Sequence, residues 1–90
     1  MSVAWSLTAT GPHRIDTVMG CADDHEDAVT ALLAATQDAI DAAERSAAPA
    51  AHYELRAAGA LVALIQTGTD EHGDPDYAAT SALIQRIAAT

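Results

Sequence analysis

Alanine is the feature that most constrains the fold of this chain. Twenty-three of its 90 residues are alanine, and it has no phenylalanine and no lysine. Alanine is the strongest helix former, but its methyl group buries little apolar area. A chain of this length forms one domain, and a small domain leaves much of its surface exposed. We therefore expect a mainly α protein with a thin core that completes a helical bundle by dimerisation.

The first ten residues have a different pattern. Val3, Trp5 and Leu7 alternate with small or polar residues, which is the period-two signature of an extended segment. We expect residues 1–10 to form an extended arm, with Trp5 as its aromatic anchor on the helices.

A seven-residue recurrence of apolar and small residues follows the Gly11-Pro12 pair. It runs from Ile15 through Val29 to Ala43 and predicts a helix over residues 12–47. In the alternative interpretation the helix starts near Asp23 or Asp24, and Ile15–Met19 form a second strand after a Gly-Pro turn. Residues 24–46 are helical in both interpretations.

Two more helices are expected in the second half of the chain. Pro49 favours a helix start, and the large apolar residues that follow predict a second helix over residues 49–66 with a wide buried arc. Asp74-Pro75-Asp76 predicts the start of a third helix over residues 75–89. The sum is a single helical domain over residues 1–90, a helical hairpin with a broken second arm.

The charge excludes some classes of partner. The formal net charge is −9 and the pI is about 4.4, so phosphate backbones are repelled and we expect no direct nucleic-acid binding. No apolar run is long enough to span a bilayer, so we expect no membrane insertion. The N-terminus has no basic and apolar signal pattern, which makes the cytoplasm the default location.

Two acidic clusters contain a histidine, and each is a candidate metal site. The candidates are His25 within residues 23–27, and His72 with Asp74 within residues 70–76. The second cluster lacks the ligand spacing of a calcium-binding loop, and acids near a helix start are favoured by the helix dipole. Cys21 and His25 are four residues apart, but no third group completes a catalytic set. We therefore expect no metal, no cofactor and no catalytic residue.

The apolar stripe and arc of the predicted helices define a candidate partner interface. A second copy or a related helical protein would cover it. Its residues are Trp5, Ile15, Met19, Val29, Leu32, Leu33, Ile40, Leu61 and Ile65.

In outline, the chain resembles a known family. A leader with Trp5, a Gly-Pro start, two alanine-rich acidic helices and a tail reading Gly73-Asp74-Pro75-Asp76-Tyr77 are similar to the small ESAT-like helical-hairpin proteins of actinobacterial type VII secretion. The resemblance implies a dimeric four-helix bundle that is exported without a cleaved signal peptide. Two departures are the missing Trp-x-Gly turn and the missing acid four residues after Tyr77, where Ser81 stands.

Three hypotheses about function follow. The first is a non-enzymatic protein–protein interaction module, in the form of a secretion-associated helical hairpin. The second is an acidic inhibitor, antitoxin or DNA mimic that binds a basic partner through its charge. The third is a small metal-binding protein or enzyme that uses His25 or His72 with the neighbouring carboxylates.

Overall fold

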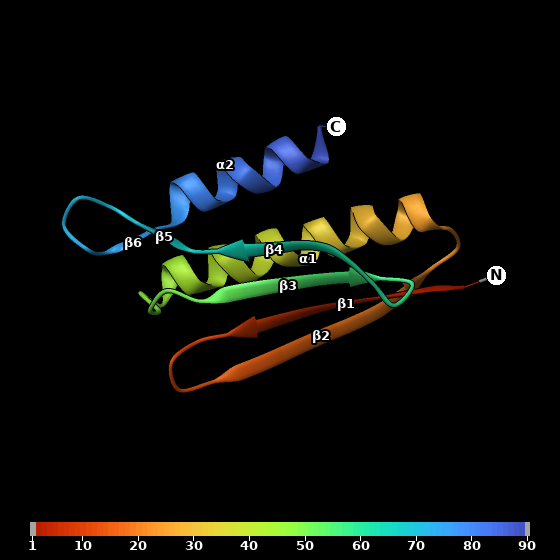
Figure 1. The fold of residues 1–90 in the computed structure, drawn as a ribbon, viewed down its shortest axis with the longest axis horizontal. Coiled ribbons are helices and arrows are strands. Elements are labelled where there is room, and N and C mark those ends of the chain that lie inside the picture. Colours follow the sequence, from red (N-terminus) through yellow and green to blue (C-terminus); the bar gives the residue numbers. More distant parts are fainter. Residues whose placement is uncertain (1, 90) are drawn as a thin grey trace.

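The computed structural model describes residues 2–89, which form a small α+β domain with a four-stranded antiparallel sheet. The order of the strands in space is β2-β1-β3-β4 (Figure 1). A short second ladder pairs β5 with β6. The elements are β1 (Val3–Thr10), β2 (Ile15–Ala22), α1 (His25–Arg45), β3 (His52–Ala57), β4 (Ala60–Gln66), β5 (Gly68–Thr69), β6 (Pro75–Asp76) and α2 (Tyr77–Ala88).

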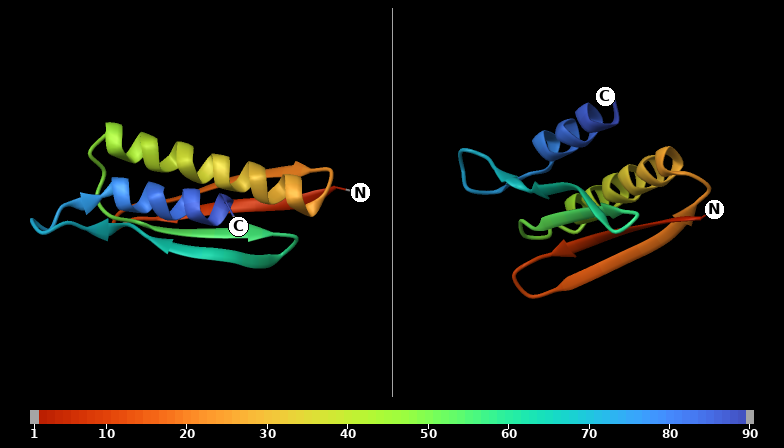
Figure 2. Two further views of the ribbon diagram at one scale, coloured as in Figure 1. Left: turned by 90° about the horizontal axis from the view of Figure 1, so that it is seen from above. Right: turned by 45° about the vertical axis from the view of Figure 1, so that its right-hand side comes forward.

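Both helices lie on the same side of the sheet (Figures 1 and 2). Helix α1 packs mainly across β1 and β3 and also contacts β2, and α2 packs beside α1. No other part of the described chain covers the opposite side, which we call the open face. Side chains alternate along a strand, so the neighbours of the buried residues point to this face. They include Ser6, Thr8, Ile15, Thr17, Met19, Cys21, Glu54, Arg56, Leu61 and Leu64.

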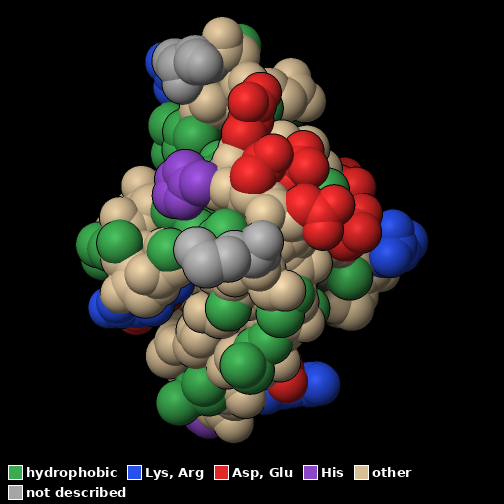
Figure 3. Space-filling model, turned by 90° about the vertical axis from the view of Figure 1, so that its right-hand side faces the viewer, with side chains coloured by type: hydrophobic (Ala, Val, Ile, Leu, Met, Phe, Trp, Pro, Cys, Tyr) green, Lys and Arg blue, Asp and Glu red, His purple; other side chains and the backbone are tan. Residues whose placement is uncertain are grey.

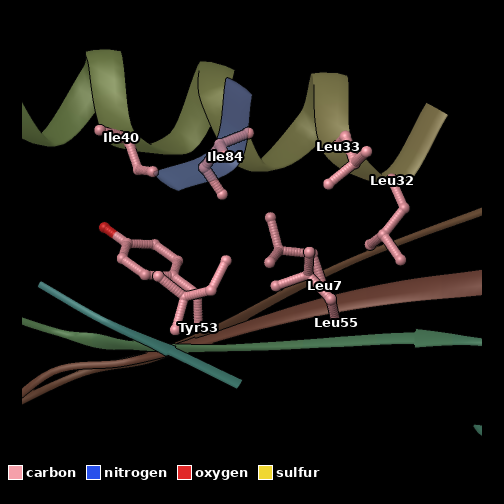
Figure 4. Packing of buried hydrophobic residues seen from close by; sticks show 8 residues of the cluster. Leu7, Leu32, Leu33, Ile40, Tyr53, Leu55 and Ile84 are labelled. Atoms are coloured by element: carbon pink, nitrogen blue, oxygen red, sulfur yellow. The ribbon is translucent and has the colours of Figure 1, made fainter. Parts of the chain in front are cut away.

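The core lies between the sheet and the two helices. Figure 4 shows side chains from the strands meeting side chains from α1 and α2. The buried cluster consists of Leu7, Leu32, Leu33, Ile40, Tyr53, Leu55, Ile65 and Ile84. One copy of the chain therefore encloses a core of its own, and a bundle completed by dimerisation is not what buries these residues.

The expected mainly α fold is wrong, and the largest error concerns residues 49–66. This segment forms β3 and β4 rather than a helix. In β3, Tyr53 and Leu55 are buried beneath the helices while their neighbours face away, which is strand periodicity. The turn between the strands is Ala58-Gly59, with φ of 53° and 77°. Positive φ at both central residues is typical of a two-residue hairpin turn, and glycine tolerates it without steric cost.

The helix predicted over residues 12–47 is shorter than expected at its start. It begins at His25, and residues 15–22 form β2, as in the alternative interpretation. The β1–β2 hairpin closes at the Gly-Pro pair, where the Gly11 N–H donates to the Arg14 carbonyl at 2.8 Å. Asp24 is the N-cap of α1, and its side chain accepts from the Asp27 N–H at 2.8 Å.

The two ends of the chain also differ from a helical hairpin. Residues 3–10 are extended, but they form a central strand of the sheet rather than an arm over helices. Helix α2 begins at Tyr77 instead of residue 75, and Asp76 caps it by accepting from the Ala79 N–H at 3.0 Å. The helical hairpin implied by the family resemblance is therefore not the fold of this chain.

Candidate interaction surface

The predicted partner interface divides into two groups in the structure. Leu32, Leu33, Ile40 and Ile65 are buried in the core of a single copy, so none of them can contact a partner. The predicted helical fold leaves them for an interface because it contains no sheet that would cover them. Val29 and Trp5 are partly buried and pack against the same core. Val29 lines a cleft of about 960 Å³ between α1, α2 and β4.

The other predicted interface residues are exposed, and they lie on the two edge strands. The exposed large apolar side chains are Ile15 (68%), Val18 (49%), Met19 (75%), Leu61 (54%) and Leu64 (64%). Of these, Val18 and Leu64 are not among the residues of the predicted interface. All but Val18 belong to the open face, and together they form an apolar border on each side of a polar centre.

Strand β2 is accessible from more directions than any other strand. Every residue from Ile15 to Met19 is exposed. On the helix side, α1 leaves a groove of about 470 Å³ beside β2, with Val18 and Leu7 in its lining. The wall from α1 includes the alanines Ala39, Ala42 and Ala43, whose small side chains leave this groove open. From Ile15 to Met19, β2 is thus exposed on both faces and on its outer edge, whereas Gly20 and Ala22 are half-buried.

The hydrogen-bonding groups on the outer edge of β2 follow from the hairpin. The Gly11 N–H to Arg14 carbonyl bond fixes which pairs exchange hydrogen bonds, and in an antiparallel ladder these alternate. Residues 16, 18, 20 and 22 therefore bond to β1. The N–H and C=O groups of Ile15, Thr17, Met19 and Cys21 point away from the sheet and have no strand beside them in the described chain.

The opposite edge of the sheet is less regular. Where β4 pairs with β3, the register shifts between Leu55 and Arg56, which makes Val62 an extra residue in the ladder. A bulge of this kind twists an edge and hinders the addition of another strand. The β1–β2 ladder has eight consecutive pairs without such a shift.

Apart from Asp16, the acidic side chains lie outside β2, and the nearest of them, Asp23 and Asp24, directly follow its last residue, Ala22. Asp23, Asp24, Glu26 and Asp27 gather at the start of α1, and Figure 3 shows acidic side chains at this end of the molecule. Within β2 the single acid is Asp16, and its Oδ2 lies 2.7 Å from Nε of Arg14. The outer edge of β2 therefore carries no uncompensated charge.

The candidate metal ligands do not assemble into a site. Among residues 2–89, no group of three or more histidine, cysteine, aspartate or glutamate side chains could hold a metal ion. His25 and His72 are both exposed, and they lie on different elements, at the start of α1 and in the loop after β5. Asp70 accepts from the backbone N–H groups of His72 and Asp74 at 2.8 and 3.0 Å, which accounts for its place in the acidic loop.

The Cys21 thiol is exposed on β2, and its predicted helical neighbour His25 begins a different element. Since the two residues do not share a helix, their four-residue spacing does not place them on one face.

No helix among residues 2–89 is long and apolar enough to cross a bilayer.

The raised pKa of the buried Tyr53 predicts how the stability of the fold changes at alkaline pH. Burial raises the pKa of Tyr53 above its ordinary value of 10.0, while a hydrogen bond with the Thr67 side chain lowers it and the nearby Tyr77 raises it. Because the folded pKa is the higher one, the neutral phenol stabilises the fold fully below pH 10, and this stability is lost as pH rises through the folded pKa. We expect the free energy of unfolding to fall above pH 10, and to fall less in Tyr53→Phe. Denaturant unfolding at several alkaline pH values measures this, and equal slopes for both proteins would contradict it.

Comparisons with known proteins found no match. No protein-family model, no curated protein and no solved structure matches this chain.

Proposed function

We propose that this chain is a non-enzymatic protein–protein interaction module and that its partner is a second copy of itself. The observation that carries the proposal is the state of β2, which exposes Ile15, Val18 and Met19 and an unpaired edge. Unpaired edges bind other strands readily, and proteins that remain monomeric block them with charged side chains, proline, bulges or covering loops. Residues 15–22 contain no proline or bulge, and their one charged residue, Asp16, is paired with Arg14.

Self-association also agrees with the size of the chain. A small domain buries a modest share of its apolar surface, so covering exposed apolar side chains adds a substantial fraction to its stability. Full burial of one methionine or isoleucine side chain contributes about 1.5–3 kcal/mol. In a symmetric pair each contact forms twice, so a few exposed apolar side chains on one strand contribute substantially to the free energy of association.

We expect Met19→Ser to weaken self-association by about 2- to 30-fold in Kd, because each dimer loses two apolar cross-strand contacts that contribute about 0.2–1 kcal/mol each. Light scattering over a concentration series measures this against the chain mass of 9.2 kDa. Leu64→Ser is the matched control, since Leu64 is similarly exposed but lies on β4. We expect it to keep the dimer.

Two results would contradict the proposal. A wild-type mass of one chain throughout the concentration range would remove self-association altogether. Dissociation by Leu64→Ser but not by Met19→Ser would place the interface on β4 instead of β2.

The acidic residues at the start of α1 favour a second candidate function, an acidic inhibitor that binds a basic protein surface. Asp23, Asp24, Glu26 and Asp27 are exposed and close in sequence, and the whole chain is acidic. Attraction between exposed charges is screened by salt. This function would be supported by a monomeric chain whose complex with a basic protein weakens steeply as salt is added.

A further inference from the structure

We infer that two copies join through β2, antiparallel about a two-fold axis, so that their sheets form one continuous eight-stranded sheet. This inference rests on the proposed self-association and specifies its geometry. The strand order would be β4-β3-β1-β2 in one copy, followed by β2-β1-β3-β4 in the other.

The backbone of β2 suits this arrangement. Ile15, Thr17 and Met19 alternate with the residues that bond to β1, so their N–H and C=O groups line the outer edge at regular spacing. A second β2 running in the opposite direction presents the same groups at the same spacing. An isologous contact of this kind closes after two copies.

The charges also favour β2 as the meeting point. Two copies that each carry a net charge of −9 repel one another, so they must meet where the surface is least acidic. Residues 15–22 fit this requirement, since Asp16 is their single acid and is paired with Arg14, while Asp23 and Asp24 lie just beyond the end of the strand. The exposed face of α1 carries Asp38, Asp41 and Glu44, and the loop after β5 carries further acids.

Cross-strand pairing favours one register. A two-fold axis at Thr17 places Ile15 of each copy opposite Met19 of the other on the open face, which forms two apolar pairs. Such pairs each contribute about 0.2–1 kcal/mol. The same register places Asp16 opposite Val18. A shift of the axis to Asp16 would place two like charges opposite each other, which is unfavourable.

In the competing arrangement two copies stack through their open faces. The charged residues at the centre of the open face make this stacking unfavourable. Glu54 and Arg56 form an ion pair there, beside Thr8 and Ser6. Burying a charged pair between two sheets carries a desolvation penalty that can exceed the attraction between the charges. Pairing through β2 leaves Glu54 and Arg56 in water.

The groove beside β2 gains a second half in this arrangement. One copy supplies a wall from α1 and a floor that includes Leu7 and Val18. Pairing of the two β2 strands places the grooves of both copies next to each other, on either side of the two-fold axis. The result is a single trough between the two α1 helices.

Cysteine cross-linking tests the pairing. In a Cys21→Ser background, Thr17→Cys and Thr8→Cys each place one thiol on the open face, and a short bifunctional thiol reagent then links thiols that lie close together. The two variants are matched, because Thr8 and Thr17 are opposite in register and each substitution removes the same 3.3 Å hydroxyl contact. We expect a cross-linked dimer from Thr17→Cys and at least about tenfold less from Thr8→Cys, which lies one strand further from the axis. The same measurement on Leu64→Cys reports random collisions.

Each other outcome overturns the inference in a recognisable way. Equal cross-linking of Thr8→Cys and Thr17→Cys indicates stacked faces, and a high yield from Leu64→Cys indicates pairing through β4. In both cases light scattering still shows a dimer, so self-association stands and the β2 pairing fails. A monomer in light scattering, with no cross-linking above the collision level, removes both.

Discussion

Leu55→Ala is expected to destabilise the fold by about 2–5 kcal/mol, the usual cost of removing a large aliphatic side chain from a core. Leu55 is fully buried in β3, directly opposite Leu7 in β1. Figure 4 shows it next to Leu7, on the side of the sheet that faces α1. The truncation leaves a cavity that rigid strands on both sides cannot close, so the upper half of this range is expected.

Thermal unfolding measures the effect, with the wild type and the variant at equal protein concentration because self-association would add to stability. For a domain of this size, each kcal/mol lowers Tm by roughly 4–8 °C. Leu64→Ala is the control, since it removes the same atoms from an exposed position and should change stability by less than about 0.5 kcal/mol. Equal losses in both variants would contradict the assignment of Leu55 to the core.

Helix α1 is the element that sequence analysis located best, because its signals are local. Asp24 caps the first turn, and apolar residues recur at helical spacing behind it. The error of assigning the preceding residues to the same helix came from alanine. Ala22 kept the seven-residue recurrence in phase, although a small side chain fits a strand as well as a helix.

The sequence contains a strand pattern for β3 and β4, but the high helix propensity of the same residues favours a helix. Tyr53, Leu55 and Ala57 alternate with polar residues, and Gly59 stands where a two-residue turn needs positive φ. High helix propensity in a stretch rich in alanine and leucine favoured the opposite interpretation. Pairing with β1, which lies about 50 residues away in sequence, overrides that propensity, and single-residue preferences do not contain this information.

Which apolar residues are exposed depends on this strand pairing, so the exposed surface could not be predicted without knowledge of the sheet. Leu32 and Ile40 need a partner if the fold is a helical hairpin, but the sheet of the same chain covers them. Val18 is exposed because α1 crosses β1 and β3 and leaves a groove over β2. The packing of the helices on the sheet therefore decides which apolar residues are left exposed for an interface.

Gly20→Ala is the second substitution with a large expected effect, and its cause is a close approach within the β1–β2 ladder. Gly20 lies opposite Trp5, whose indole ring crosses over it. A methyl group on Gly20 would lie 2.4 Å from Cζ2 and 2.6 Å from Cε2 of the indole. The ring or the strand must move, and overpacking of this kind costs about 1–3 kcal/mol. We expect a lower Tm and an altered tryptophan emission spectrum, because Trp5 is the only tryptophan in the chain.

A double-mutant cycle isolates the contact between Gly20 and Trp5. In a Trp5→Leu background the indole is absent, so Gly20→Ala should cost about 1 kcal/mol less than in the wild type, and the difference is the coupling energy of the pair. Gly68→Ala is the control for glycine itself, since nothing would lie within 4 Å of its new methyl group. If Gly20→Ala cost the same in both backgrounds, the indole would not lie over Gly20. The loss would then come from the β2 backbone, for instance from a change in how its outer edge pairs.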